Sequence, residues 1–297
     1  MEFAVGIWNP DPSDGAIDAL RAEGITAIEF GPPFLLQEDK GALISAAERY
    51  HAAGIRFYAC HSPFDEEADL SQTDEEARQN ALAIQMRALA HAALAGAECM
   101  VIHPSRRCPD KEVPQRTDRL YASLETLLRA AQETGVRLAL ENMLPAHVGS
   151  QSADVRTIVG EFDSPYLGVC FDTGHAHVNE EGVHAAFEAL RDRIIAFHLA
   201  DNDGHKDQHS QPPYGTIDWS AFVPAFRAMD FAHPATVEAP PWGRASSGVL
   251  LREVEALFAG EWPTFRLGGR EVRAICHRCG HYLFGPLDAP FCACGHG

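Results

Sequence analysis

Six apolar segments of this chain each end on a side chain that can bind a metal ion. Apolar runs of this length, bounded by glycine, proline and polar residues, are typical of strands buried on both faces of a parallel sheet. Because burying an unpaired carboxylate or imidazolium is costly, a His, Asp or Glu at the end of strand after strand needs a common partner. A divalent metal ion at the carboxyl ends of the strands is the simplest such partner. The segments are residues 55–61 ending at His61, 100–103 ending at His103, 136–141 ending at Glu141, 167–172 ending at Asp172, 194–198 ending at His198 and 235–238 ending at Glu238.

These segments belong to a longer alternation of strand-like and helix-like patterns, which repeats eight times along the chain. Eight β/α units in about 260 residues match the size of a (β/α)8 TIM barrel, the α/β fold class that we predict. An open, doubly wound sheet is the alternative, but the count of eight and the lack of a glycine-rich phosphate loop after the first strand disfavour it. In a barrel all strands end on one face, so residues as far apart in the chain as His61 and Glu238 would share one rim. The strands are expected to begin near Glu2, Ile25, Ile55, Glu98, Val136, Tyr166, Arg193 and Pro234.

Seven amphipathic stretches between the expected strands have the chemistry of helices. The second opens with Thr73 and Glu76, which have the spacing of a capping box. The third ends just before a strand at Gly135, the residue type that most often follows a helix. The stretches cover residues 13–23, 73–96, 112–135, 152–161, 182–191, 219–230 and 246–258.

The composition is that of an acidic globular protein. Hydrophobic residues make up 46% of the 297 residues, and no apolar run approaches the roughly 18 residues of a membrane span, so no membrane partner is expected. The net charge of −18, without a basic block, argues against a general nucleic-acid binder. The N-terminal segment lacks the basic start of a signal peptide, and a cytoplasmic location is therefore expected. Four scattered cysteines are interpreted as small buried hydrophobic residues, namely Cys60, Cys99, Cys108 and Cys170.

Several segments at or after the expected strand ends carry motifs: CHSPF (60–64), VIHPS (101–105), LALEN (138–142), GVCFDTGHAH (168–177), FHLADNDGHKDQH (197–209), YGTIDW (214–219) and TVEAP (236–240). Together they resemble the xylose-isomerase-like TIM barrels, over residues 1–260. That superfamily includes sugar phosphate isomerases and epimerases, inosose dehydratases, and AP endonucleases of the endonuclease IV type. The most specific parts are Asp-Thr-Gly-His at 172–175 and the run from His198 to Asp207-x-His209.

The resemblance implies a metal site at the barrel mouth. The positions shared across the superfamily would be Glu141, Asp172, His198 and Glu238. The further ligands of the endonuclease branch are matched by His61, His103, His175, Asp207 and His209. Carboxylates mixed with imidazoles suit Mn²⁺, Mg²⁺, Co²⁺ or Zn²⁺, and one to three ions are expected. Many sugar isomerases of the superfamily keep some of the additional residues, so the match leaves the reaction open.

Two reactions fit this ligand set. The first, which we prefer, is isomerisation or epimerisation of a sugar or sugar phosphate through a metal-stabilised enediolate, with Glu141 and Glu238 transferring the proton and His175 steadying a hydroxyl or oxyanion. The alternative is phosphoester hydrolysis at a trinuclear zinc site of the endonuclease IV type. DNA is disfavoured as the substrate, because the loop at 31–37 lacks Arg and Lys and the chain is acidic. A non-catalytic metal sensor is a third class, which the complete ligand set argues against.

Substrate-binding residues are expected on the rim loops. Aromatic side chains there could form an apolar wall for a sugar ring, and basic side chains could bind a phosphate or a hydroxyl. The alternatives are ordinary packing for the aromatic residues and solvated charge for the basic ones. The candidates are Trp8, Phe64, Arg106, Lys206 and Trp242.

The repeat stops near Pro263, and we predict a barrel of residues 1–262 followed by a tail of residues 263–297. Two cysteine pairs in the tail resemble the knuckles of a zinc ribbon, although the second pair is spaced one residue more closely than usual. We predict a structural zinc ion; disulfides are the alternative, which the expected cytoplasmic location disfavours. Such a tail could mediate contact between subunits, so a homo-oligomer is one expectation. The predicted zinc ligands are Cys276, Cys279, Cys292 and Cys294.

Overall fold

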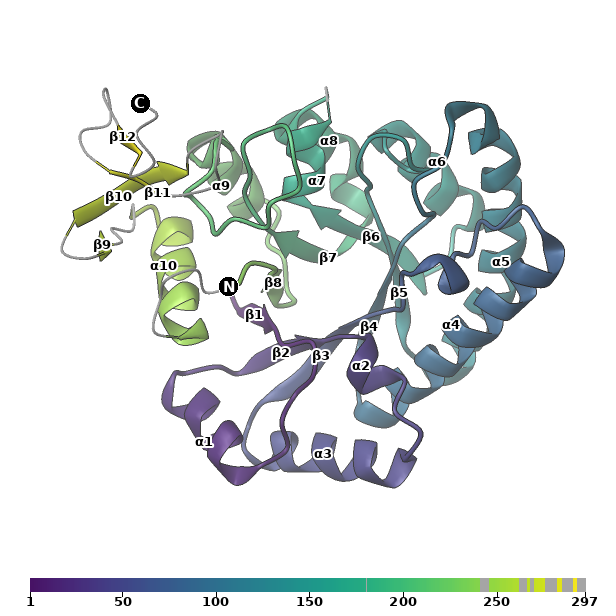
Figure 1. Cartoon of the computed structure of the whole chain (residues 1–297), viewed down its shortest axis with the longest axis horizontal. Helices are drawn as coiled ribbons and strands as arrows, with labels where there is room; N and C mark the ends of the chain where they lie inside the picture. The colour runs from purple at the N-terminus through teal and green to yellow at the C-terminus, as the bar shows by residue number, and fades with distance from the viewer. Residues whose placement is uncertain are drawn as a thin grey trace.

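The computed structural model describes residues 1–179, 181–240 and 246–261, together with the backbone of four short strands between residues 266 and 292. Eight parallel strands pair in chain order and close between β8 and β1, which makes a TIM barrel with helices around its outside (Figure 1). The predicted fold class is confirmed. The strands are β1 (Phe3–Gly6), β2 (Ala27–Phe30), β3 (Arg56–His61), β4 (Cys99–Ile102), β5 (Arg137–Glu141), β6 (Leu167–Asp172), β7 (Ile194–Leu199) and β8 (Ala235–Val237).

Side chains alternate along each strand between the layer under the helices and the barrel interior. On β5, Leu138 packs in the large outer core, Ala139 packs in a separate inner cluster, and Glu141 follows Ala139 by two residues. The same step leads from Cys170 to Asp172 on β6. Mostly small side chains therefore fill the barrel interior, and on β5 and β6 the next inward position toward the carboxyl end carries a predicted ligand. The inner cluster consists of Ala4, Ala27, Tyr58, Ala59, Cys99, Val101, Ala139, Cys170 and Ala196.

The helices of the described residues cover the outside of the barrel (Figure 1). Seven of them correspond to predicted stretches, and Gly135 ends α5 in the left-handed conformation, with φ 77°. The predicted capping box is wrong by one residue. Asp74, and not Thr73, caps α4, because its carboxylate accepts the backbone N–H of Ala77 at 2.9 Å. The α-helices are α1 (Asp14–Ala22), α2 (Pro32–Leu35), α3 (Lys40–Ala52), α4 (Glu75–Ala95), α5 (Val113–Thr134), α6 (Ser152–Phe162), α7 (Thr173–Val178), α8 (Val183–Leu190), α9 (Trp219–Arg227) and α10 (Ser247–Ala259), and short 3-10 helices span Glu66–Ala68, Asp110–Glu112 and Arg191–Arg193.

Three helices, α2, α3 and α7, were not predicted. The pattern of α3 was readable in the sequence. Its buried residues Leu43, Ala46, Ala47 and Tyr50 have helical spacing, and Asp39 caps its N-terminus. The helices α2 and α7 have only 4 and 6 residues, too few for such a periodicity to appear.

After α10 the chain forms a small four-stranded sheet with the order β12-β11-β10-β9, drawn in yellow in Figure 1. Its strands are β9 (Arg266–Leu267), β10 (Arg270–Ile275), β11 (Tyr282–Phe284) and β12 (Phe291–Cys292). Cys276, Cys279 and Cys294 lie outside the described residues, and so does the side chain of Cys292. The structural zinc site and the boundary after residue 262 therefore stay predictions.

Two further expectations concern the barrel residues. Cys60, Cys99, Cys108 and Cys170 are free and buried, as predicted. Across the described part of the chain, no helix combines the length and the apolar character that a membrane span needs.

Candidate metal centre

Four predicted ligands converge at the carboxyl ends of β5 to β8; we call Glu141, Asp172, His198 and Glu238 the inner group. His198 Nδ1 lies 2.8 Å from Glu141 Oε1 and 3.0 Å from Glu238 Oε2. The same nitrogen lies 3.9 Å from Asp172 Oδ2. One ligand atom from each of the four residues lies within 4.8 Å of the others. The barrel thus brings together side chains that are up to 97 positions apart in the chain, from Glu141 to Glu238.

The donor atoms of the inner group fit a divalent cation. Glu141 Oε2 and Asp172 Oδ2 are buried, and neither accepts a hydrogen bond. A buried carboxylate oxygen without a donor is costly, and a bound cation would satisfy it. Three carboxylates and one imidazole nitrogen suit Mn²⁺, Mg²⁺, Co²⁺ or Zn²⁺.

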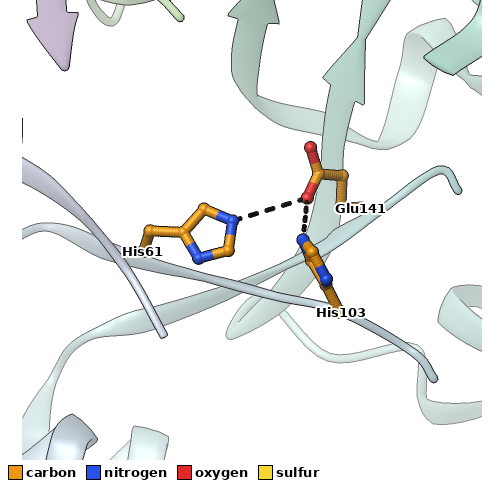
Figure 2. A group of neighbouring side chains, drawn as sticks. All are labelled: His61, His103 and Glu141. Carbon is orange, nitrogen blue, oxygen red and sulfur yellow. Dashed lines mark ion pairs between the residues drawn. The ribbon is translucent and has the colours of Figure 1, made fainter. Parts of the chain in front are cut away.

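Two histidines face Oε2 of Glu141. Figure 2 shows His61, from the end of β3, and His103, which follows β4, pointing at the same carboxylate oxygen. Their Nε2 atoms lie 3.8 and 2.8 Å from Glu141 Oε2, although neither is aligned for a hydrogen bond with it. His61 Nδ1 donates to the backbone carbonyl of Ser62 at 2.8 Å, which leaves Nε2 free to bind a ligand. Glu141 therefore faces His198 with one oxygen and these two histidines with the other, as a carboxylate that bridges two ions would.

His175 on α7 and two residues of the loop after β7, Asp207 and His209, form what we call the outer group. Asp207 Oδ2 lies 3.4 Å from His175 Nε2 and 3.0 Å from His209 Nε2, and Asp207 Oδ1 is buried without a partner. The Nδ1 atoms of the two histidines donate to the backbone carbonyls of Asn142 and Glu238, at 2.9 and 3.0 Å. Both Nε2 atoms are therefore directed at Asp207, and the structure brings all nine predicted ligands to one mouth.

The Asp-Thr-Gly-His motif has a local explanation. Asp172 caps α7 with Oδ1, which accepts the backbone N–H of His175 at 2.6 Å, and this leaves Oδ2 for a metal ion. The side chain of Asn142 makes two hydrogen bonds to the backbone of Asp172, at 2.8 and 3.0 Å. At Gly174 a Cβ atom would lie only 3.2 Å from the amide nitrogen of Asn202, so a larger residue would crowd this turn.

The charges of the site depend on one another. Burial opposes the ionisation of Glu238, but His198 outweighs it and lowers the pKa of Glu238 to about 2. Burial is the main cause that raises the pKa of Asp172 to about 7. Burial also opposes the charged form of His209, yet Asp207 and Glu238 raise the pKa of His209 to about 10. Without a metal ion, protons on the imidazoles supply the positive charge that these buried carboxylates require.

One polar residue of the site, Glu29 on β2, was not predicted. It is 5% exposed, and its two carboxylate oxygens lie 3.0 and 3.2 Å from His198 Nε2. Its Oε2 also accepts the hydroxyl of Thr236 at 2.8 Å. The available signal was a charged residue inside the apolar strand 27–30, two positions after the inward-facing Ala27.

The loop that carries Asp207 and His209 of the outer group is anchored by Asp201, which is fully buried after β7. Its carboxylate accepts the backbone N–H groups of Gly215 and Ile217 at 2.9 and 3.1 Å and the indole N–H of Trp219 at 2.7 Å. Burial raises the pKa of Asp201 to about 6, against these hydrogen bonds. The loop is thus closed on itself around one carboxylate.

Two of the predicted substrate-binding residues form an aromatic wall at the mouth. Trp8 and Phe64 are 43% and 38% exposed, with ring centroids 5.9 Å apart. Trp8 lies 5.3 Å from the ring of His61, and Phe64 lies 5.3 Å from the ring of His103. Arg106 is exposed and donates to the backbone carbonyl of Phe64 at 3.1 Å. All three residues therefore border the ligands.

The other two candidates are less informative. Lys206 is exposed on the loop after β7, and Trp242 lies outside the described residues.

A cavity of about 430 Å³ beside the inner group is lined by residues that include Trp8, His209 and Glu238. This volume is in the range of small-molecule sites.

Two curated proteins are similar to this chain over most of its length. Uncharacterized protein y4fM of Sinorhizobium fredii (strain NBRC 101917 / NGR234) is 26% identical over 262 residues, which cover 78% of this chain and 83% of that protein. A probable endonuclease 4 of Mycoplasmoides gallisepticum (strain R(low / passage 15 / clone 2)) is 23% identical over 260 residues, which cover 80% of this chain and 85% of that protein.

Among solved structures, a D-tagatose 3-epimerase-like protein superposes with a TM-score of 0.74 at 21% sequence identity, covering 88% of this chain and 97% of the other. At this identity the likeness concerns the fold. Residues 17–253 match the family described as xylose isomerase-like TIM barrel, and this span contains all nine predicted ligands. The chain belongs to the xylose isomerase-like TIM barrel family.

Proposed function

We propose that this protein is a divalent-metal-dependent isomerase or epimerase of a sugar or sugar phosphate. The observation that carries the proposal is the pair Glu141 and Glu238, which approach the same imidazole nitrogen of His198 from β5 and from the end of β8. A divalent ion held by the inner group would act as a Lewis acid on the carbonyl and the adjacent hydroxyl of the substrate. The two glutamates would then flank the carbon beside that carbonyl.

Proton transfer is the task of these two glutamates. One carboxylate takes the proton as the C–H bond breaks, and the electron pair moves toward the carbonyl oxygen. Return of a proton to the opposite face of the same carbon epimerises the sugar. Return to the former carbonyl carbon, together with transfer of the hydroxyl proton to the former carbonyl oxygen, isomerises it. In the metal-free protein the charge of His198 outweighs burial, holding the pKa of Glu141 well below its usual range and that of Glu238 at about 2. A divalent ion bound in place of the proton on His198 Nδ1 would likewise favour the ionised carboxylates, which could then accept a proton from the substrate.

The surroundings of the pair suit a small polyhydroxylated substrate. The cavity of about 430 Å³ beside Glu238 is bordered by the apolar face of Trp8. His175 would hold a substrate hydroxyl or the developing oxyanion. Arg106 and Lys206 are exposed cations of the rim loops that would bind a phosphate or a hydroxyl. The fold shared with a D-tagatose 3-epimerase-like protein supports this substrate class.

The test is hydrogen exchange in D₂O. The protein, loaded in turn with Mn²⁺, Mg²⁺, Co²⁺ and Zn²⁺, is incubated with a panel of ketoses and ketose phosphates, and NMR follows deuterium entering the carbon beside the carbonyl. We expect Glu141→Gln and Glu238→Gln to lower the rate by about 10²–10⁴-fold. Asp69→Asn is the matched control, because Asp69 is a buried carboxylate that pairs with Arg116, 3.0 Å away, and touches no predicted ligand. A metal-loaded protein that exchanges no hydrogen with any sugar would contradict the proposal.

The outer group favours a second candidate, a phosphoester hydrolase with three zinc ions. Asp207 Oδ1 has no partner, and the Nε2 atoms of His175 and His209 face the other oxygen of Asp207. The similarity to a probable endonuclease 4 supports this alternative. Elemental mass spectrometry and assays with bis(p-nitrophenyl) phosphate and abasic DNA distinguish the two. Three tightly held zinc ions, phosphodiester cleavage and no deuterium exchange would favour the hydrolase.

A further inference from the structure

We propose that Glu29 is the positioning residue that makes His198 bind the metal ion through Nδ1. The inference rests on the metal site of the proposed function and on contacts that lie outside the predicted ligand set. Both oxygens of Glu29 face His198 Nε2, at 3.0 and 3.2 Å, whereas Nδ1 faces Glu141 and Glu238. The imidazole of His198 therefore lies between the carboxylates of Glu141 and Glu238 on one side and that of Glu29 on the other.

Metal binding through Nδ1 depends on the tautomer of His198. A neutral imidazole carries one N–H, and only the other nitrogen has a lone pair for a metal ion. Because Glu29 accepts at Nε2, it holds the proton on that atom and leaves the lone pair on Nδ1. A carboxylate behind a ligating histidine also orients the ring and strengthens its donor nitrogen.

His198 differs in this respect from three other predicted ligands. The Nδ1 atoms of His61, His175 and His209 donate to backbone carbonyls. Backbone carbonyls are neutral acceptors that no side-chain substitution removes. His198 instead donates to a charged acceptor, and hydrogen bonds to ionised groups are the stronger kind. Its strength as a ligand is thus set by a residue that mutation can change.

Glu29 is held rigidly in the barrel. The hydroxyl of Thr236 on β8 donates to Oε2 at 2.8 Å, so the carboxylate is held by two strands across the barrel interior. The space that Glu29 shares with His61 and Glu238 amounts to about 10 Å³. That is at the lower limit for one water molecule, so solvent has little room to replace the carboxylate.

The experiment measures metal affinity in the absence of any sugar. Apoprotein is titrated with Co²⁺ and with Zn²⁺ in competition with a chromophoric chelator, and the dissociation constant of the tightest site is compared among variants. Glu29→Gln keeps the shape and removes the charge, and we expect affinity to fall about 10–100-fold. Thr236→Val leaves the carboxylate in place but frees one oxygen, and we expect a smaller loss, of about threefold. Asp69→Asn, the buried carboxylate remote from the ligands, should bind like the wild type.

Circular dichroism and thermal unfolding of the apoproteins check that each variant folds. A second readout is the ¹⁵N NMR spectrum of the ring nitrogens, in which the Nε2–H of His198 should be retained in wild type and lost or shifted in Glu29→Gln. If a folded Glu29→Gln binds Co²⁺ and Zn²⁺ as tightly as wild type, the inference is wrong. If Glu29→Gln does not fold, unchanged affinity in Thr236→Val overturns it instead. If Glu29→Gln binds metal more weakly but the wild type turns over no sugar, the role of Glu29 stands and the isomerase function is rejected. If the wild type binds neither Co²⁺ nor Zn²⁺, both the role of Glu29 and the isomerase function are rejected.

Discussion

The inner and outer groups of predicted ligands meet at one mouth but are held in different ways. Asp172 and His198 belong to strands paired on both sides, and both are fully buried. Asp207 and His209 belong to a loop, and their side chains are 20% and 35% exposed. The positions of strand ends are determined by pairing with two neighbours, whereas the position of a loop residue depends on a few local contacts.

This difference separates two properties of the site. Strand pairing places three of the four residues of the inner group, and Glu238 directly follows β8. Asp207 and His209 of the outer group depend on the loop after β7 closing around Asp201. We therefore expect the inner group to decide whether the protein binds a divalent ion at all. The outer group should decide how many ions bind and which reaction follows.

The largest expected effect comes from the same chemical change made in each group. Asp172→Asn keeps an oxygen that can cap α7 but replaces the unpaired Oδ2 with an amide nitrogen. Loss of a charged ligand should weaken the tightest ion by at least about 10³-fold, more than the 10–100-fold typical of residues behind the ligands. Asp207→Asn should weaken it by less than about tenfold. Calorimetric titration with Co²⁺ measures both, and equal losses would remove the distinction between the groups.

An intermediate effect is expected from His209→Ala. Removal of one ligand of the outer group should lower the metal content of fully loaded protein by one ion if that group binds one. The activity that depends on that ion should fall about 10–100-fold. Elemental mass spectrometry gives the content, with His205→Ala as the control because His205 is an exposed histidine of the same loop. Unchanged content would mean that the outer group binds no ion and acts on substrate or structure only.

The pH dependence should also differ between the metal-free and the loaded protein. The pKa of His209 is raised in the fold from 6.5 to about 10, so its pairing with Asp207 stabilises the apoprotein fully below pH 6.5 and is lost as pH rises through 10. As this proton leaves over the same pH range, it competes less with a metal ion for His209. The metal affinity of the outer group should therefore increase. Thermal unfolding of apoprotein at pH 7 and at pH 10 checks the first part. The difference between wild type and His209→Ala should shrink at the higher pH, and a difference that grows would contradict the assignment.

The smallest effect on metal binding is expected from Asp201→Asn. The amide cannot accept all the hydrogen bonds that the carboxylate accepts from Gly215, Ile217 and Trp219. Buried donors left without partners should cost about 1–3 kcal/mol of unfolding free energy. The looser loop should weaken the outer group a few-fold and leave the inner group unchanged. Urea unfolding and Co²⁺ titration measure the two quantities, and a larger loss at the inner group would show that the groups are coupled.

The strands of the barrel were largely predictable from local patterns. Seven strands begin one residue after their predicted starts and β2 begins two residues after, because apolar runs bounded by turn residues mark strands clearly. The helix α7 was missed because it has only 6 residues, and its start depends on the cap that Asp172 provides. Glu29 was missed because a lone carboxylate within a strand has no partner that is visible in the sequence.

Residue types and their order along the chain were enough to predict a barrel and six candidates for metal binding at the strand ends, since both depend on short-range periodicity and on the cost of burying charge. His175, Asp207 and His209 were predicted from the resemblance to the family. The different ways in which the two groups are held, and the contact between Glu29 and His198 across 169 positions, appear only in the folded barrel. Such contacts depend on which inward side chains face one another across the interior. That pairing is set by strand register and closure, and not by distance along the chain.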